Sequence, residues 1–138
     1  MKMDAAAFVA DQSLIEALKK HATPVPCHGN RILFNQGEAP GGLYIFCGGE
    51  LILTMKSTMG DELMRIPAEK GSLLGLPGLI GNVPYSLSAY AKDGAEVGYV
   101  SREDLNHLML SNPSVSVGIL RVLAAEVRTA RMALVEAL

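Results

Sequence analysis

One stretch of the chain, from Gly71 to Ala91, has the glycines and hydroxyls of an anion-binding loop but no charged side chain. Its four glycines, with Pro77 at the head of a short turn, leave backbone amides free, and such amides can form a nest that receives an anion. Tyr85, Ser86 and Ser88 add neutral hydroxyl groups. Because no Arg or Lys completes the loop, these residues predict a site for a neutral or weakly polar ligand.

Residues that usually bind metals or act in catalysis are scattered along the chain. The three histidines, His21, His28 and His107, lie far apart in sequence and form no His-x-His or Glu-x-x-x-His pattern. Cys27 and Cys47 lack CxxC spacing, so we expect two unbridged thiols rather than a disulfide or a metal pair. No nucleophile elbow or paired carboxylate stands out. We therefore expect no catalytic residue, no metal site and no enzymatic activity.

The length and composition indicate one folded domain, which we take to be residues 1–138. Hydrophobic residues make up 49% of the chain and charged residues 19%, a richer apolar share than disordered sequences have. The formal net charge of -2 provides no general attraction to phosphate backbones. We expect no direct contact between this segment and nucleic acid.

The uncharged stretch is as long as a membrane span, but its composition argues against one. Pro77, Pro84 and the glycines would leave backbone groups unpaired in lipid. The first ten residues place an acid close to the lysine and have too short an apolar run for a secretory signal. These features predict a cytoplasmic protein with no membrane partner.

Short strands are expected across the middle of the chain, because turn residues recur every eight to twelve positions or so. A leading helix over 11–20 precedes them. Three antiparallel pairings are predicted: the hairpin Leu43–Met55 around Gly48-Gly49, a return of Asp61–Pro67 through Ser57–Gly60, and a hairpin around Asp93-Gly94.

Two helices are expected at the end of the chain. Ser101 is expected to cap the first of them, which runs to about Leu110. Asn112-Pro113 is expected to separate that helix from a long final helix over about 114–138. Apolar residues recur on the final helix with spacings of three and four, which predicts a coiled-coil seam and a homodimer. The seam residues are Leu120, Leu123, Val127 and Leu134. The neighbouring Glu126, Arg128, Arg131 and Glu136 are expected to form a solvated rim.

These motifs, taken together, resemble the cyclic nucleotide-binding domain of the CRP/FNR regulator family. The resemblance rests on Ile32–Glu38 with its Gln-Gly-Glu turn, on Leu43–Leu51, on the glycine framework of Gly71–Ser88 and on Asn112-Pro113. It implies an α+β fold: an antiparallel β-roll, also described as a jelly roll or double-stranded β-helix, with a short N-terminal helix and a long C-terminal dimerisation helix. In regulators of this family a helix-turn-helix domain usually follows, and whether this chain is a stand-alone module or part of a longer regulator stays open.

The resemblance also implies a ligand site, which this chain changes at its charged positions. Leu76 stands where the family has a glutamate for the ribose, and Tyr85 where it has an arginine for the cyclic phosphate. Leu76 cannot accept a hydrogen bond, and Tyr85 offers one neutral donor in place of a guanidinium. Tight binding of cyclic AMP or cyclic GMP is therefore not expected. The residues assigned to the ligand site are Gly75, Leu76, Pro77, Gly78, Tyr85, Ser86 and, from the partner chain, Arg131.

Two functions from different classes fit these sequence features, and each predicts a different structure around the glycine-rich stretch. A sensory module, whose small-molecule effector enters between the glycine-rich stretch and the last helix, requires a cavity behind 75–85. A ligand-free dimerisation or scaffold module would instead fill that space with Leu76, Leu79, Ile80 and Tyr85. A roll-type enzyme would need a metal or polar cluster, which the sequence does not provide.

Overall fold

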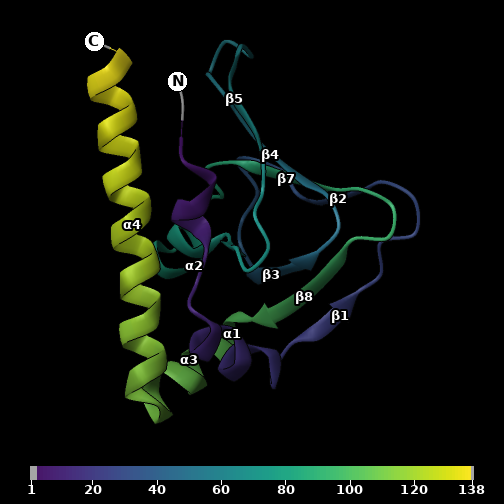
Figure 1. Ribbon diagram of the computed structural model, residues 1–138, viewed down its shortest axis with the longest axis vertical. Helices are drawn as coiled ribbons and strands as arrows, with labels where there is room; N and C mark the ends of the chain where they lie inside the picture. Colours follow the sequence, from purple (N-terminus) through teal and green to yellow (C-terminus); the bar gives the residue numbers. More distant parts are fainter. Residues whose placement is uncertain (1–2, 138) are drawn as a thin grey trace.

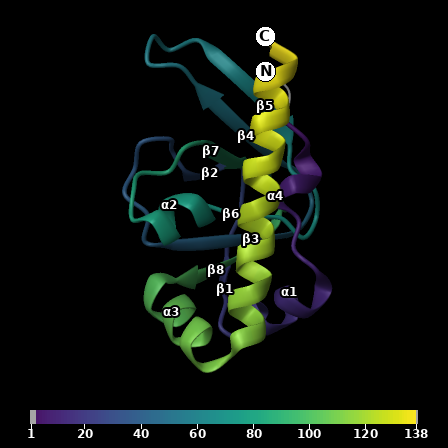
Figure 2. The same cartoon turned by 90° about the vertical axis from the view of Figure 1, so that its left-hand side faces the viewer.

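In the computed structural model, which describes residues 3–137, the strands form an antiparallel roll and the longest helix runs along one side of it (Figures 1 and 2). The α+β β-roll predicted from the sequence is confirmed. Within the described residues the roll consists of two four-stranded sheets. In spatial order, one sheet contains β1 (Thr23–Val25), β8 (Glu96–Ser101), β3 (Gly42–Gly48) and β6 (Leu73–Leu74). The other contains β2 (Arg31–Phe34), β7 (Ser88–Ala91), β4 (Leu51–Lys56) and β5 (Glu62–Pro67).

Two of the three predicted strand pairings are wrong, although the strands themselves form. β3 and β4 belong to different sheets, and so do β7 and β8. Gly49 and Gly94 adopt the positive φ angles expected at their turns, 88° and 80°. At each of these turns the chain passes from one sheet to the other. The turn residues favour a reversal of the chain but do not determine which strand the next strand pairs with. The β4–β5 pairing is confirmed, with Met55 opposite Met64.

Two of the helices begin at side chains that cap them, and the second of these caps, Ser101, was predicted. Asp11 accepts a hydrogen bond from the Leu14 amide at 2.8 Å and starts α1 (Gln12–Lys19). Ser101 accepts from the Asp104 amide at 3.2 Å and starts α3 (Arg102–Ser111). The last helix, α4 (Pro113–Ala137), follows at a bend of 117° from α3. Its predicted end, Leu138, lies outside the described residues.

A short 3₁₀ helix, η1 (Ala5–Phe8), packs against α4 and was not predicted. The side chain of Asp4 accepts a hydrogen bond from the Ala6 amide at 3.0 Å and begins this turn. Phe8 is buried in the roll interior. The N-terminal segment therefore helps to cover the space between the roll and α4.

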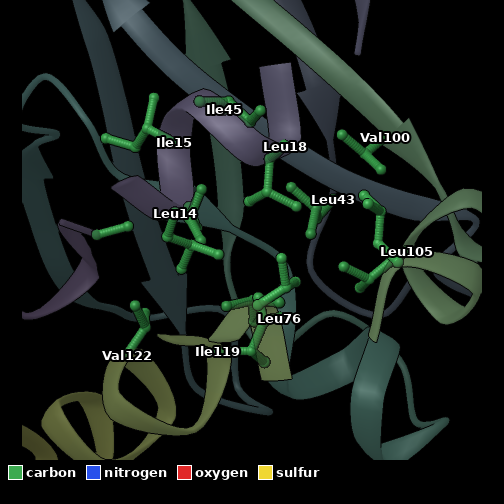
Figure 3. Close-up of a cluster of buried hydrophobic side chains, with 14 of the residues drawn as sticks. Leu14, Ile15, Leu18, Leu43, Ile45, Leu76, Val100, Leu105, Ile119 and Val122 are labelled. Atoms are coloured by element: carbon green, nitrogen blue, oxygen red, sulfur yellow. The ribbon is translucent and has the colours of Figure 1, made fainter. Parts of the chain in front are cut away.

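Strand β3 contributes to two hydrophobic clusters, because successive side chains point to opposite faces of a strand. Leu43 and Ile45 pack under the helices, in the cluster shown in Figure 3. Tyr44 and Phe46 point into the roll, where side chains from both sheets meet. The helices are thereby fixed to the outer face of the strand that also lines the roll interior.

Within residues 3–137, we find no single helix that has both the length and the apolar composition to cross a membrane. The bent pair α3 and α4 meets those two criteria only when the helices are taken together.

We predict that Gly42→Ala destabilises the domain by about 2–3 kcal/mol, because β3 has no room for a Cβ at this position. The added atom would collide with the Val100 carbonyl oxygen and would lie 2.6 Å from Cζ of Tyr99. Urea unfolding followed by circular dichroism measures the change.

Gly81→Ala is the matched control, because its Cβ would meet Val83 at an ordinary 3.6 Å. We expect this variant to stay within about 0.5 kcal/mol of the wild type. Equal stability of the two variants would contradict the assigned packing of β3.

Candidate functional site

A cavity of about 270 Å³ lies between the glycine-rich stretch and α4, where a sensory module requires it. Gly75, Pro77 and Gly78 form one wall, at the start of α2 (Leu76–Gly81). Residues of α4 form the facing wall, and Phe8 and Phe34 close the inner end. A larger groove of about 840 Å³ lies between η1 and the outer side of α4, but it is more open to solvent. The smaller cavity is less open to solvent and is the better candidate for a small-molecule site.

The structure brings together five of the seven residues assigned to the ligand site. They are Gly75, Pro77, Gly78, Tyr85 and Ser86. Leu76 does not line the cavity; it is completely buried in the cluster under the helices, among the side chains of Figure 3. Arg131 is exposed on α4 and does not line the cavity within this chain.

Gly75 has no room for a larger residue. Its φ of 94° is a left-handed conformation that favours glycine, and a Cβ would lie 2.6 Å from the ring of Tyr85. This turn directs the chain into α2, which has no side-chain cap at its N-terminus. The close approach of backbone and ring fixes one side of the cavity.

Tyr85 occupies the position that the resemblance assigns to a phosphate-binding arginine. Its ring stacks on Phe34 with 4.2 Å between centroids, and its hydroxyl donates to the Gly42 carbonyl at 2.7 Å. Burial, with a smaller contribution from Tyr44, raises the pKa of Tyr85 to about 12. The side chain is thus neutral, and its one donor is already used within the protein.

Of the three hydroxyl groups predicted to be available to a ligand, those of Tyr85 and Ser88 are already hydrogen-bonded within the protein. Ser88 is buried, and its Oγ accepts a hydrogen bond from the Gln36 amide at 2.7 Å. Ser86 remains exposed and lines the cavity. Local pattern could not show that Tyr85 and Ser88 bind to distant backbone groups.

Arg102 fixes α2 against the rest of the domain and was not identified from the sequence. Its guanidinium donates to the carbonyls of Leu79 and Pro40, both at 2.9 Å, and its amide donates to Gly41 at 2.9 Å. Because Arg102 is also the first residue of α3, it joins the cavity wall to the C-terminal helices.

Glu126 is buried at the cavity, although the sequence predicted it on a solvated rim. It lines the cavity with only 8% of its surface exposed, and its Oε2 has no hydrogen-bond partner. Burial raises the pKa of Glu126 to about 8. The missed signal is its spacing: Val115, Ile119, Val122 and Glu126 follow one another at intervals of four, three and four on the buried face of α4.

The four residues of the predicted dimer seam lie on two parts of α4. Leu120, Val127 and Leu134 are 61%, 49% and 58% exposed and form a stripe along the helix. Leu123 is half-buried, packs against the core and lines the cavity. Their role in dimerisation remains a prediction.

Among the residues that the structure describes, no group of three or more His, Cys, Asp or Glu side chains is placed to hold a metal ion. The arrangement offers instead an apolar space with one buried carboxyl group and one hydroxyl.

Residues 25–112 match the sequence model of the cyclic nucleotide-binding domain. No curated protein matches the chain in sequence. The chain has the same fold as the catabolite activator protein of Thermus thermophilus, with 22% identity and a TM-score of 0.78 over 95% of this chain and 62% of that protein. The chain therefore spans less than two thirds of the length of that regulator.

Two further solved structures share the fold at similar identity. The N-terminal domain of a transcriptional regulator from Streptomyces coelicolor is 21% identical, with a TM-score of 0.66 over 92% of this chain and 91% of that domain. The c-di-GMP responsive global regulator CLP of Xanthomonas campestris is 20% identical, with a TM-score of 0.63 over 88% of this chain and 63% of that protein.

We predict that Glu126→Gln makes the domain more stable at alkaline pH. The unfolded state loses the Glu126 proton near the ordinary pKa of 4.5, whereas the folded state keeps it to about 8. The stability contributed by this group is therefore complete below about pH 4.5 and is lost as the pH rises to about 8. Relative to the wild type, the variant should gain about 2–4 kcal/mol between pH 5 and pH 8.5, measured by urea unfolding.

Glu136→Gln removes an exposed carboxylate from the same helix and serves as the control. Its stability should follow the wild-type pH curve. A Glu126→Gln curve parallel to that of the wild type would show that the Glu126 carboxyl is not buried in solution.

Proposed function

The chain belongs to the cyclic nucleotide-binding domain family, and we propose that it is the sensory module of a CRP/FNR-type regulator or signalling protein with an altered ligand site. In this proposal an effector enters between α2 and α4 and changes how α4 packs. The supporting observation is the 270 Å³ cavity between these two helices, together with the loss of the charged groups that a cyclic phosphate requires.

A cyclic nucleotide fits this cavity poorly on electrostatic grounds. None of the described residues that line it is Arg or Lys, and the Tyr85 hydroxyl already donates to Gly42. A buried phosphate without a cationic partner is costly. Glu126, when ionised, would add repulsion. The effector of the proposed module is therefore a molecule other than cyclic AMP or cyclic GMP.

Dimerisation through α4 is part of the proposal. The stripe of Leu120, Val127 and Leu134 would otherwise remain an exposed apolar surface. Its spacing matches the seam of two packed helices. Ala124 and Arg131 lie at the intermediate positions of this stripe, and Arg131 would thereby lie near the partner subunit.

A ligand-free scaffold is the second candidate, and the buried Tyr85, which lines the cavity and stacks on Phe34, favours it. Leu76 and Leu79 are buried in the cluster under the helices instead. Ile80, the fourth residue expected to fill the space, is 40% exposed. The remaining cavity favours the sensory role.

A cytoplasmic location belongs to the same proposal, since Cys27 and Cys47 are both free thiols, as is usual in reducing compartments.

We predict that cyclic AMP and cyclic GMP bind more weakly than about 100 μM, because each would lose a charge-assisted contact worth several kcal/mol. Isothermal titration of the purified protein measures this, with a circular dichroism melt of the same sample as the fold control. Micromolar binding of either nucleotide would overturn the proposed change of ligand.

We predict that the wild type is a dimer and that Leu120→Glu combined with Leu134→Glu is a folded monomer. Both side chains are more than half exposed, so charged replacements should break the seam without disturbing the core. Size-exclusion chromatography with light scattering gives the mass.

Met132→Glu is the matched control, because Met132 is 56% exposed but lies in the groove beside η1. This variant should stay dimeric. A monomeric wild type, or a dimeric double variant, would remove α4 as the dimer interface.

A further inference from the structure

We infer that the cavity binds a small, uncharged and mainly apolar molecule whose single polar group exchanges hydrogen bonds with Glu126. This inference rests on the proposed sensory function, and it names the chemical class of the effector. It starts from the one polar side-chain atom, Oε2 of Glu126, that is buried without a partner among the described residues.

An unpartnered buried carboxyl oxygen is unusual, because buried polar groups in native proteins nearly always have a hydrogen-bond partner. Glu126 lines a cavity large enough to admit another molecule. Among the described residues, Glu126 forms no salt bridge that would explain its burial as an ion pair. A bound molecule would supply the missing partner.

The rest of the cavity is apolar and adaptable. Phe8, Phe34, Met55 and Leu123 supply aromatic, thioether and aliphatic surface. Methionine adjusts to ligands of irregular shape and makes favourable contacts with aromatic rings. Such walls favour a hydrocarbon body, and the polar part of the ligand is directed to the α4 side.

The charge of the ligand follows from the titratable groups around the cavity. Of the described lining residues only Tyr85 and Glu126 titrate near or above neutral pH, and both are held neutral by burial. An anion would find no Arg, Lys or His among the described residues that line the cavity. A cation would require Glu126 to ionise and would itself lose its water shell. A neutral hydroxyl or amide can donate to and accept from the protonated carboxyl without either cost.

The size of the ligand follows from the volume. At about 30 Å³ per water, 270 Å³ holds about nine waters, or a molecule with a similar number of non-hydrogen atoms. Octanol, octylamine and octanoic acid each have about this size and share one hydrocarbon chain. They differ only in the headgroup and therefore test the charge of the preferred ligand directly.

A ligand held by Glu126 would also contact the proposed dimer seam. Val127 lines the cavity and belongs to the exposed stripe of α4. Occupancy of the cavity is thus in a position to alter the packing of two α4 helices, which is what a sensory module requires.

The test is isothermal titration of the full chain at pH 7 with 1-octanol, octylamine and octanoate. We expect saturable binding of octanol, no binding of octanoate and weak binding of octylamine. Glu126→Gln, which keeps a hydrogen-bonding amide, should bind octanol within about threefold of the wild type. Glu126→Met, which keeps the length but no polar group, should bind about tenfold more weakly. Glu136→Gln should behave as the wild type.

Three results would overturn the inference. No binding of octanol would leave a water-filled cavity, and equal binding by Glu126→Met would show that Glu126 does not recognise the ligand. Preferred binding of octylamine with proton release would make the ligand class cationic.

Failure of the proposed sensory function would look different. Hydrogen exchange of residues 114–137, measured with and without octanol, reports whether α4 responds. Octanol binding through Glu126 with unchanged exchange would support the ligand class and contradict the sensory role.

Discussion

The hydrogen bond from the Tyr85 hydroxyl to the Gly42 carbonyl, at 2.7 Å, is the contact on which the ligand site depends. It fixes the aromatic ring above Gly75, whose missing Cβ leaves the space that the ring needs. Gly42 in turn has no room for a side chain against Val100 and Tyr99. A tyrosine at this position thus places a neutral group, already hydrogen-bonded, where the resemblance assigns an arginine, and it requires glycine at position 75.

Much of the fold could be predicted from the sequence, because caps, breaks and strand periodicity are local. The leading helix and the helix capped by Ser101 form as expected, and β4 and β5 pair through the predicted turn. The hairpins around Gly49 and Gly94 were wrong for a non-local reason. A Cβ on Gly49 would lie 2.9 Å from Cα of Ala95, so these two corners pack against each other. Which sheet a strand joins depends on such contacts between distant segments.

The site was harder to predict because α4 carries two stripes, each of which has the spacing of one face of a helix. One contains Val115, Ile119, Val122 and Glu126, and the other contains Leu120, Val127 and Leu134. Each pattern alone is compatible with a buried face, and the second has the larger apolar residues. Only the packed structure shows that the stripe with the carboxyl group faces the roll. Leu76 likewise could point to either side of α2, and it packs under the helices.

The burial of Glu126 lowers the stability of the folded domain, and in a regulatory domain a ligand could restore this stability. An effector can shift a conformational equilibrium only by as much as its affinity differs between the two states. A carboxyl group without a partner raises the free energy of the empty state, and a ligand that pairs with it recovers that energy only while α4 is docked on the roll. Val127, the next residue, lies both at the cavity and on the exposed stripe, so ligand binding at Glu126 would affect the helix next to the proposed seam. The described lining of the cavity contains no arginine, so in the proposed sensory module Glu126 would provide the polar interaction that distinguishes an occupied domain from an empty one.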